Sequence, residues 1–137
     1  MEKILQLEVT VPERQVLSNT VDSVQVPAKD GYIGVLPGHA ALITELGSGV
    51  LSFSINGTEK CLALNGGLME VLPNSVRILA DSVEWAEEVD SERAKNAHQR
   101  ATEMLKHPET EIDVERAMRA ISRSEARIEA AHRAKKS

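Results

Sequence analysis

The chain has 137 residues, a formal net charge of −5 at pH 7 and only three aromatic residues, Tyr32, Phe53 and Trp85. An acidic chain with so few rings to stack on bases argues against nucleic acid as a partner. The single cysteine, Cys61, excludes a disulfide framework and a thiolate metal cluster, and we expect no metal site. No apolar run approaches the roughly 20 residues that span a bilayer, so we expect membrane association only through another protein.

Residues 1–86 carry the pattern of a β domain. Apolar and polar residues alternate over residues 4–11, which predicts a half-buried strand that ends at Pro12. Further short strands are predicted at residues 16–17, 21–26, 32–35, 68–72 and 76–80. Turn residues separate these strands and no helical pattern intervenes. The pattern is typical of an antiparallel sandwich or barrel.

Two glycine-containing runs predict turns in this domain. Asn56-Gly57 follows an alternating stretch that ends at Ile55 and precedes a return strand with Cys61 and Ala63, which predicts a tight hairpin. A second turn is predicted at residues 65–67, which read Asn-Gly-Gly. This run lacks the following Lys-Ser or Lys-Thr and the helix of a phosphate-binding loop, so we do not expect it to bind phosphate.

The sequence predicts no catalytic site. His39 lies in a turn without an evident catalytic partner, so a hydrogen-bonding role is the expectation. Cys61 falls in a hairpin strand and is expected to be a small buried apolar residue. Because no Ser, His and acid constellation stands out, we expect a non-catalytic protein.

Residues 87–137 predict two helices joined by a turn at Pro108. Asp90 is the expected N-cap of the first helix and Asp113 that of the second. The apolar stripes consist of Ala94, Ala97, Ala101, Met104 and Leu105 on the first helix, and of Val114, Ala117, Ile121, Ser124 and Ile128 on the second. Small residues let the helices pack closely as an antiparallel pair but bury little apolar area. The hairpin is therefore either a mobile element or a permanent cap on the β domain, and the pattern favours neither.

The second helix also carries a basic face, formed by Arg116, Arg119, Arg123 and Arg127. Residues 113–137 hold seven basic and four acidic residues, a net charge of +3, so the rest of the chain carries −8. The face is either solvated and offset by neighbouring glutamates, or it grips an anion such as a phosphate or the acidic side chains of a partner.

Together these features resemble a known family. The run GYIGVLPGHA at residues 31–40 resembles the Gly-Glu-Leu-Gly-Ile-x-Pro-Gly-His-Ala stretch of the F-type ATP synthase epsilon subunit. Residues 64–71 resemble its Gly-Gly-x-x-Glu-Val segment, and residues 76–84 resemble the strand that leads into its helices. The resemblance covers essentially the whole chain. It implies an α+β fold, with an antiparallel β-sandwich over residues 1–86 and a regulatory two-helix hairpin over residues 87–137.

The resemblance implies a non-catalytic rotor subunit of the central stalk at the cytoplasmic face of the bacterial membrane. The sandwich would bind the gamma subunit and the ring of c subunits, and so couple proton flow to ATP synthesis. The loop expected to face them contains Gly31, Tyr32, Gly34, Pro37, Gly38 and His39. Tyr32 stands where many bacterial members have glutamate. The extended hairpin would reach the alpha and beta subunits and inhibit ATP hydrolysis, with the basic face meeting acidic segments of beta.

Some members bind regulatory ATP through an Ile/Leu-Asp-x-x-Arg-Ala motif at the start of the first helix. Residues 112–117 match this motif literally but open the second helix, whereas residues 89–94 match it in position with a valine first. The resemblance therefore implies a site for ATP or Mg-ATP formed by Glu84, Val89, Asp90, Arg93, Ala94, Arg123 and Arg127. Coupling without ATP sensing, and a free-standing nucleotide sensor, are the alternatives.

Overall fold

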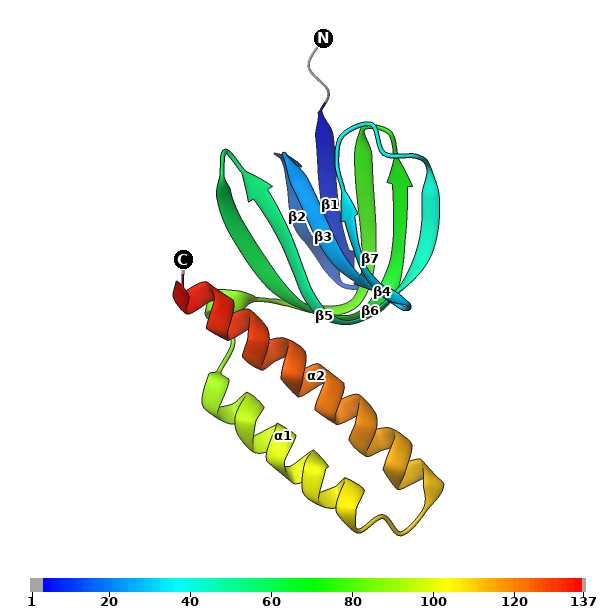
Figure 1. Cartoon of the computed structure of the whole chain (residues 1–137), viewed down its shortest axis with the longest axis vertical. Coiled ribbons are helices and arrows are strands. Elements are labelled where there is room, and N and C mark those ends of the chain that lie inside the picture. The colour runs from blue at the N-terminus through cyan, green and yellow to red at the C-terminus, as the bar shows by residue number, and fades with distance from the viewer. Residues whose placement is uncertain (1–3, 137) are drawn as a thin grey trace.

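Seven strands and two helices follow one another along the chain in a computed structural model that describes residues 4–136 (Figure 1). The bounds of the two predicted domains include residues 1–3 and 137, which lie outside the described part of the chain. The strands are β1 (Leu5–Val11), β2 (Arg14–Val21), β3 (Ser23–Ala28), β4 (Gly31–Val35), β5 (Leu42–Ile55), β6 (Thr58–Leu72) and β7 (Ser75–Trp85). A short 3-10 helix, η1 (Ala86–Glu88), leads into α1 (Ser91–Lys106) and α2 (Glu111–Lys136).

All seven strands belong to one sheet, in the order β2-β1-β7-β6-β5-β3-β4. The long strands β5, β6 and β7 curve strongly, so the sheet folds over on itself as a sandwich (Figure 1). Alternate side chains point inward and fill the core, of which Leu5, Leu51, Leu62, Met69 and Ile78 are among the largest fully buried members. The predicted α+β fold, a sandwich followed by a helical hairpin, is confirmed.

One strand pairing is parallel, which the sequence pattern did not predict. Strand β1 lies parallel to β7, with Gln6 opposite Ser75 and Thr10 opposite Leu79, whereas all other pairs are antiparallel. The pairing brings the first strand against the last strand. Because five strands lie between β1 and β7 along the chain, no local sequence pattern indicates that these two strands pair.

Of the two predicted turns, the first is confirmed and the second is wrong. Asn56 and Gly57 both have positive φ and form the two-residue connection between β5 and β6. Residues 65–67 do not reverse the chain but lie inside the continuous strand β6. Gly66 and Gly67 have φ of 69° and 130° and bend the strand instead. At Gly67 the backbone of β7 approaches so closely that a Cβ atom would meet Leu79 O.

The helices begin and end close to their predicted positions, with one correction. Asp90 is the N-cap of α1, and its side chain accepts a hydrogen bond from the Arg93 backbone N–H at 3.1 Å. Asp113 is not the cap of α2, because the helix already begins at Glu111. The Thr110 hydroxyl accepts the Asp113 N–H at 3.2 Å and takes the capping position. Asp113 lies instead in the first turn, where its charge suits the helix dipole.

Candidate functional site

Helix α2 packs on the curved part of β5 and β6, and α1 packs on the far side of α2 (Figure 1). The interface between α2 and the sheet is built from small side chains, with Val50, Cys61, Ala63, Ala86 and Ala130 in one buried cluster. Such residues allow close approach but remove little apolar area from water, at about 25 cal/mol per Å². The apolar contribution to the docking of α2 is therefore modest.

Two salt bridges add polar contacts to this interface. Arg127 Nε lies 2.8 Å and Nη2 3.5 Å from the two carboxylate oxygens of Glu84, at the end of β7. Near the C-terminal end of α2, Arg133 Nη2 lies 2.9 Å from Glu59 Oε1 on β6. The Arg127–Glu84 pair is partly shielded from solvent, whereas Glu59 of the second pair is exposed, so each pair is expected to contribute only modestly to stability. They link the basic helix to the acidic sandwich.

Cys61 lies beneath α2, close to the second salt bridge. Burial raises the pKa of its thiol, and the positive charge of Arg133 opposes part of that rise. The side chain is 6% exposed, as expected for a small apolar core residue. A neutral, covered thiol at this place reports on whether α2 is docked.

The predicted ATP-binding residues lie around the junction of β7, α1 and α2. Glu84 and Arg127 are brought together, but as a salt bridge to each other. Asp90 caps α1, while Arg93 and Arg123 are exposed and Val89 is half-buried. Ala94 is fully buried, so its methyl group is closed to a ligand in this conformation. The side-chain contacts that the structure shows among these seven residues are the salt bridge of Glu84 with Arg127 and the Asp90 cap on the Arg93 N–H.

The predicted basic face divides into two parts. Arg116, Arg119 and Arg123 are exposed, and Arg119 lies 3.9 Å from Glu115 on the same helix. Arg127 turns toward the sheet and holds Glu84. Docking therefore leaves three arginines open to solvent and occupies the fourth.

The residues of the predicted partner-facing loop lie at different places. Gly31, Tyr32 and Gly34 belong to β4, whereas Pro37, Gly38 and His39 follow this strand. The Tyr32 hydroxyl accepts the Val50 backbone N–H at 2.9 Å, so its ring lies back across β5. The Gly38 N–H donates to Pro73 O at 2.6 Å, which places this turn beside the β6–β7 turn. The expected loop is thus a strand and a separate turn beyond its end.

An exposed apolar patch on the outer face of the sheet was not predicted. It consists of Ile43, Leu68, Leu72 and Leu79, whose exposed fractions range from 42% to 67%. Leu68 on β6 and Leu79 on β7 are direct cross-strand neighbours. The signal was present in the sequence, since residues 68–72 carry leucines at the outward positions as well as apolar residues at the inward ones. A strand with apolar residues on both faces indicates a second buried surface.

The described residues offer no group of three or more His, Cys, Asp or Glu side chains placed to hold a metal ion. Neither of the described helices is long and apolar enough to cross a membrane. Both observations refer to residues 4–136, with the C-terminal residue outside them.

Comparison with known proteins identifies the family. Residues 4–86 match the family model of the beta-sandwich domain of the ATP synthase delta/epsilon chain, and residues 87–132 match that of its long alpha-helix domain. The ATP synthase epsilon chain of Solibacter usitatus is 44% identical over 128 residues, which cover 93% of this chain and 96% of that protein. The epsilon chain of Desulforamulus reducens is 42% identical over 131 residues, or 96% and 99% of the two chains.

Among solved structures, a chain of the mitochondrial ATP synthase of Euglena gracilis has the same fold. It superposes with a TM-score of 0.85 at 23% identity, over 96% of this chain and 82% of that chain. The family models span both parts of the structure, and the sequence of the Solibacter relative aligns over nearly the whole chain. The chain belongs to the family of ATP synthase epsilon subunits, which are non-catalytic subunits of the central stalk.

Proposed function

We propose that this subunit couples proton translocation to ATP synthesis as part of the rotor, and inhibits ATP hydrolysis when its helical hairpin leaves the sandwich. The observation that carries this proposal is the modest interface of α2, which consists of small side chains and two salt bridges. An interface of this kind can be opened by a partner that offers a comparable free energy. The cytoplasmic face of the bacterial membrane is the proposed place of action, with the subunit as a peripheral component of the complex.

The apolar patch of Ile43, Leu68, Leu72 and Leu79 supports a permanent partner on the outer face of the sheet. Four large apolar side chains exposed on neighbouring strands are more than the scattered surface residues of a monomer. The gamma subunit is the partner proposed for this face. The turn with Pro37, Gly38 and His39 is the segment proposed to meet the c ring, since Tyr32 is held against β5.

Binding to gamma can be tested with the double variant Leu68→Glu/Leu79→Glu. Carboxylates in a desolvated interface are costly, so co-purification of the subunit with gamma should be lost. Gln25→Glu, an exposed substitution on β3, is the matched control and should leave co-purification unchanged. Retention of gamma by the double variant would show that gamma binds another face.

Inhibition is proposed to act through the arginines of α2. Arg116, Arg119 and Arg123 are exposed even while the helix is docked, and Arg127 becomes available once Glu84 is released. Extended beside the alpha and beta subunits, this face would bind acidic side chains through charge-assisted hydrogen bonds. Comparing ATPase rates of the complex with the full chain and with a chain ending at Val89 tests this. Faster hydrolysis without the hairpin is expected, and equal rates would exclude inhibition by the helices.

Regulatory ATP binding is proposed for the cluster of Glu84, Asp90, Arg93, Arg123 and Arg127. Arginine side chains bind phosphate oxygens bidentately, and the carboxylates can accept hydrogen bonds from the base or sugar. ATP would have to replace Glu84 as the partner of Arg127, and would then change the docking of α2 directly. That existing salt bridge also favours the alternative, coupling without ATP sensing, because both groups are satisfied without a ligand.

Calorimetric titration of the isolated subunit with Mg-ATP distinguishes regulatory ATP binding from coupling without ATP sensing. The full chain should bind, and the double variant Arg123→Ala/Arg127→Ala should not. Arg116→Ala, on the exposed part of the same helix, serves as the control that keeps binding. Without a heat signal from the full chain at millimolar ATP, the coupling role without sensing would stand.

A further inference from the structure

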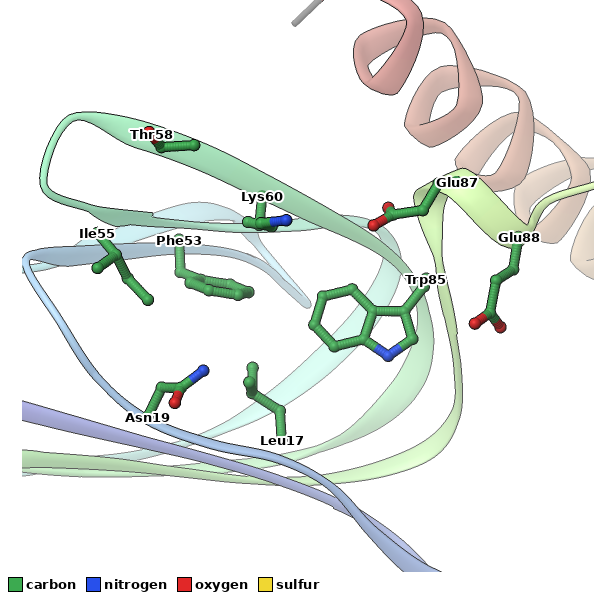
Figure 2. Close-up of a pocket in the computed structure, with 9 residues that line it drawn as sticks. All are labelled: Leu17, Asn19, Phe53, Ile55, Thr58, Lys60, Trp85, Glu87 and Glu88. Carbon is green, nitrogen blue, oxygen red and sulfur yellow. The ribbon is translucent and has the colours of Figure 1, made fainter.

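A pocket of about 450 Å³ opens at the end of the sandwich, between β2 and the β5–β6 hairpin (Figure 2). Its floor is apolar and includes Leu17 of β2, Phe53 of β5 and Trp85 of β7. Phe53 and Trp85 meet edge to face, with ring centroids 6.3 Å apart and an interplanar angle of 68°. Two of the three aromatic residues of the chain thus line one open space, whose volume lies in the usual range for binding pockets, about 300–1,000 Å³.

The pocket borders a free sheet edge. Strand β2 stands at one end of the strand order and pairs only with β1 among the described strands. Its end is tied to β5, because the Asp22 N–H donates to Ser54 O at 2.8 Å. From there toward Leu17 the two strands diverge, and the pocket occupies the gap between them (Figure 2).

This edge carries few of the features that protect sheet edges from pairing. Ser18, Asn19 and Thr20 are uncharged, and β2 contains no proline. Asn19 lines the pocket, so a chain running beside β2 would lie directly over its opening. An edge next to an apolar pocket is the arrangement used to bind extended peptides. Backbone hydrogen bonds supply affinity there, and the pocket selects a side chain.

The far side of the pocket is acidic. Glu87 and Glu88 of η1 are exposed and lie beyond Trp85, with both carboxylates at the rim (Figure 2). Neither forms a salt bridge within the described part of the chain, while Lys60 is the one basic residue on the rim. Since the chain without its second helix is strongly acidic as well, a basic group on the occupant is favoured.

We propose that the outer edge of β2 and this pocket form a docking site for an extended segment of a partner protein. The segment pairs with β2 through its backbone and places an aromatic or branched aliphatic side chain against Leu17, Phe53 and Trp85. A lysine or arginine on the same face of the segment, two residues along, reaches Glu87 and Glu88. The site is separate from the apolar patch on the outer face. It borders the C-terminal end of the α2 interface, because Thr58, Lys60 and Glu87 also line a second pocket beside Arg133 and Ala134.

The single tryptophan makes the site directly observable in the full-length subunit. The probe is the capped peptide Ac-Ser-Thr-Phe-Thr-Lys-Thr-Ser-NH2, used alongside a version with leucine in place of phenylalanine. We expect a saturable change in the emission of Trp85, together with slower amide exchange in β2. A matched peptide with aspartate in place of lysine should bind about fivefold more weakly.

A second experiment reverses the charge of the acidic rim on the protein. The exposed double variant Glu87→Lys/Glu88→Lys should prefer the aspartate peptide. Glu109→Lys/Glu111→Lys makes the same charge change at the α1–α2 turn and should keep the original preference. The absence of any emission change with both peptides at about 1 mM, a concentration that detects even weak binding, would overturn the proposal. Equally tight binding of N-acetylphenylalanine amide would also overturn it, since the pocket would then be a small-molecule site that does not use the edge of β2.

Discussion

At Gly67, the bend of β6 brings a backbone φ of 130° together with the closest approach of β7. A methyl group there would be strained in its own conformation and would overlap Leu79 O and the Cα of Ala80. We expect Gly67→Ala to lower the free energy of unfolding by about 2–4 kcal/mol, measured by urea denaturation. Gly34 has ordinary φ and open space at its Cβ position, so Gly34→Ala should change stability by no more than about 0.5 kcal/mol. Similar values for the two variants would contradict the account of the bend.

Tyr32 shows how a single hydroxyl completes a strand. Pairing between β3 and β5 is irregular between Gln25 and Ala28, and the Tyr32 hydroxyl accepts the Val50 N–H there. Val50 is 1% exposed, so loss of this acceptor leaves a covered backbone donor without a partner. Tyr32→Phe should cost about 1–2 kcal/mol in a denaturant titration and speed the amide exchange of Val50. Unchanged exchange at Val50 would mean that water replaces the hydroxyl.

The thiol of Cys61 links pH to the stability of the folded chain. Burial raises its pKa in the folded chain, whereas the unfolded thiol ionises in its ordinary range. The unfolded state therefore loses a proton first as pH rises, so the contribution of this thiol to stability is full below that range and is lost above it. At pH 8 we expect iodoacetamide to alkylate the native chain at least about tenfold more slowly than the urea-unfolded chain, followed by mass spectrometry. Equal rates would show that α2 does not cover the thiol.

At the scale of elements, the sandwich-facing side of α2 depends on the small size of Ala130, which is fully buried against β5 and β6. Ala130→Leu has no room there and should displace α2 from the sheet. Faster alkylation of Cys61 and loss of exchange protection in α2 are the expected signs. In the assembled complex, the same variant should hydrolyse ATP more slowly, because the released hairpin is the proposed inhibitor.

A control for that variant lies one residue earlier. Glu129 is exposed and lies about 100° around the helix from Ala130, so Glu129→Leu places a leucine on α2 outside the interface. Its alkylation rate should match that of the unmodified chain. If both variants behaved alike, added apolar surface rather than overpacking would be the cause.

Elements whose signals are local could be predicted, and those that depend on distant partners could not. The Asn56-Gly57 turn and the Asp90 cap follow from the conformation and hydrogen bonding of the residues themselves. Residues 65–67 carry the same kind of turn signal, but β5 and β7 on either side hold them in a continuous strand. The same glycines therefore produce a bend, because tertiary contacts override the local preference.

At the scale of the whole molecule, the order of sandwich and hairpin was readable from the change in hydrophobic period near residue 86. The contacts that join the sandwich to the hairpin could not be predicted from the sequence. Glu59 and Arg133 lie far apart in the sequence, and nothing near either residue marks the other as its partner. Of the candidate ATP cluster, the resemblance supplied the residues, but only the structure shows that Glu84 and Arg127 bind each other.

The charge separation noted in the sequence also acquires a physical role at this scale. The basic second helix rests on an acidic sandwich, and Arg127 and Arg133 form the two contacts at which the opposite charges meet. Three further arginines of the helix remain in solvent, where salt screens them within about 8–10 Å. Helix α2 thus carries both the arginines that dock the hairpin on the sandwich and the arginines proposed to bind the alpha and beta subunits.

The parallel pairing of β1 with β7 has a consequence for the time order of biosynthesis. The first strand made by the ribosome finds one of its two neighbours only when the last strand of the sheet has emerged. Such long-range pairings form slowly, because closing a long loop costs conformational entropy before any stabilising contact has formed. The sandwich is therefore complete only as the hairpin is being translated. The helices therefore find their docking surface on β5 and β6 only once the sheet has closed.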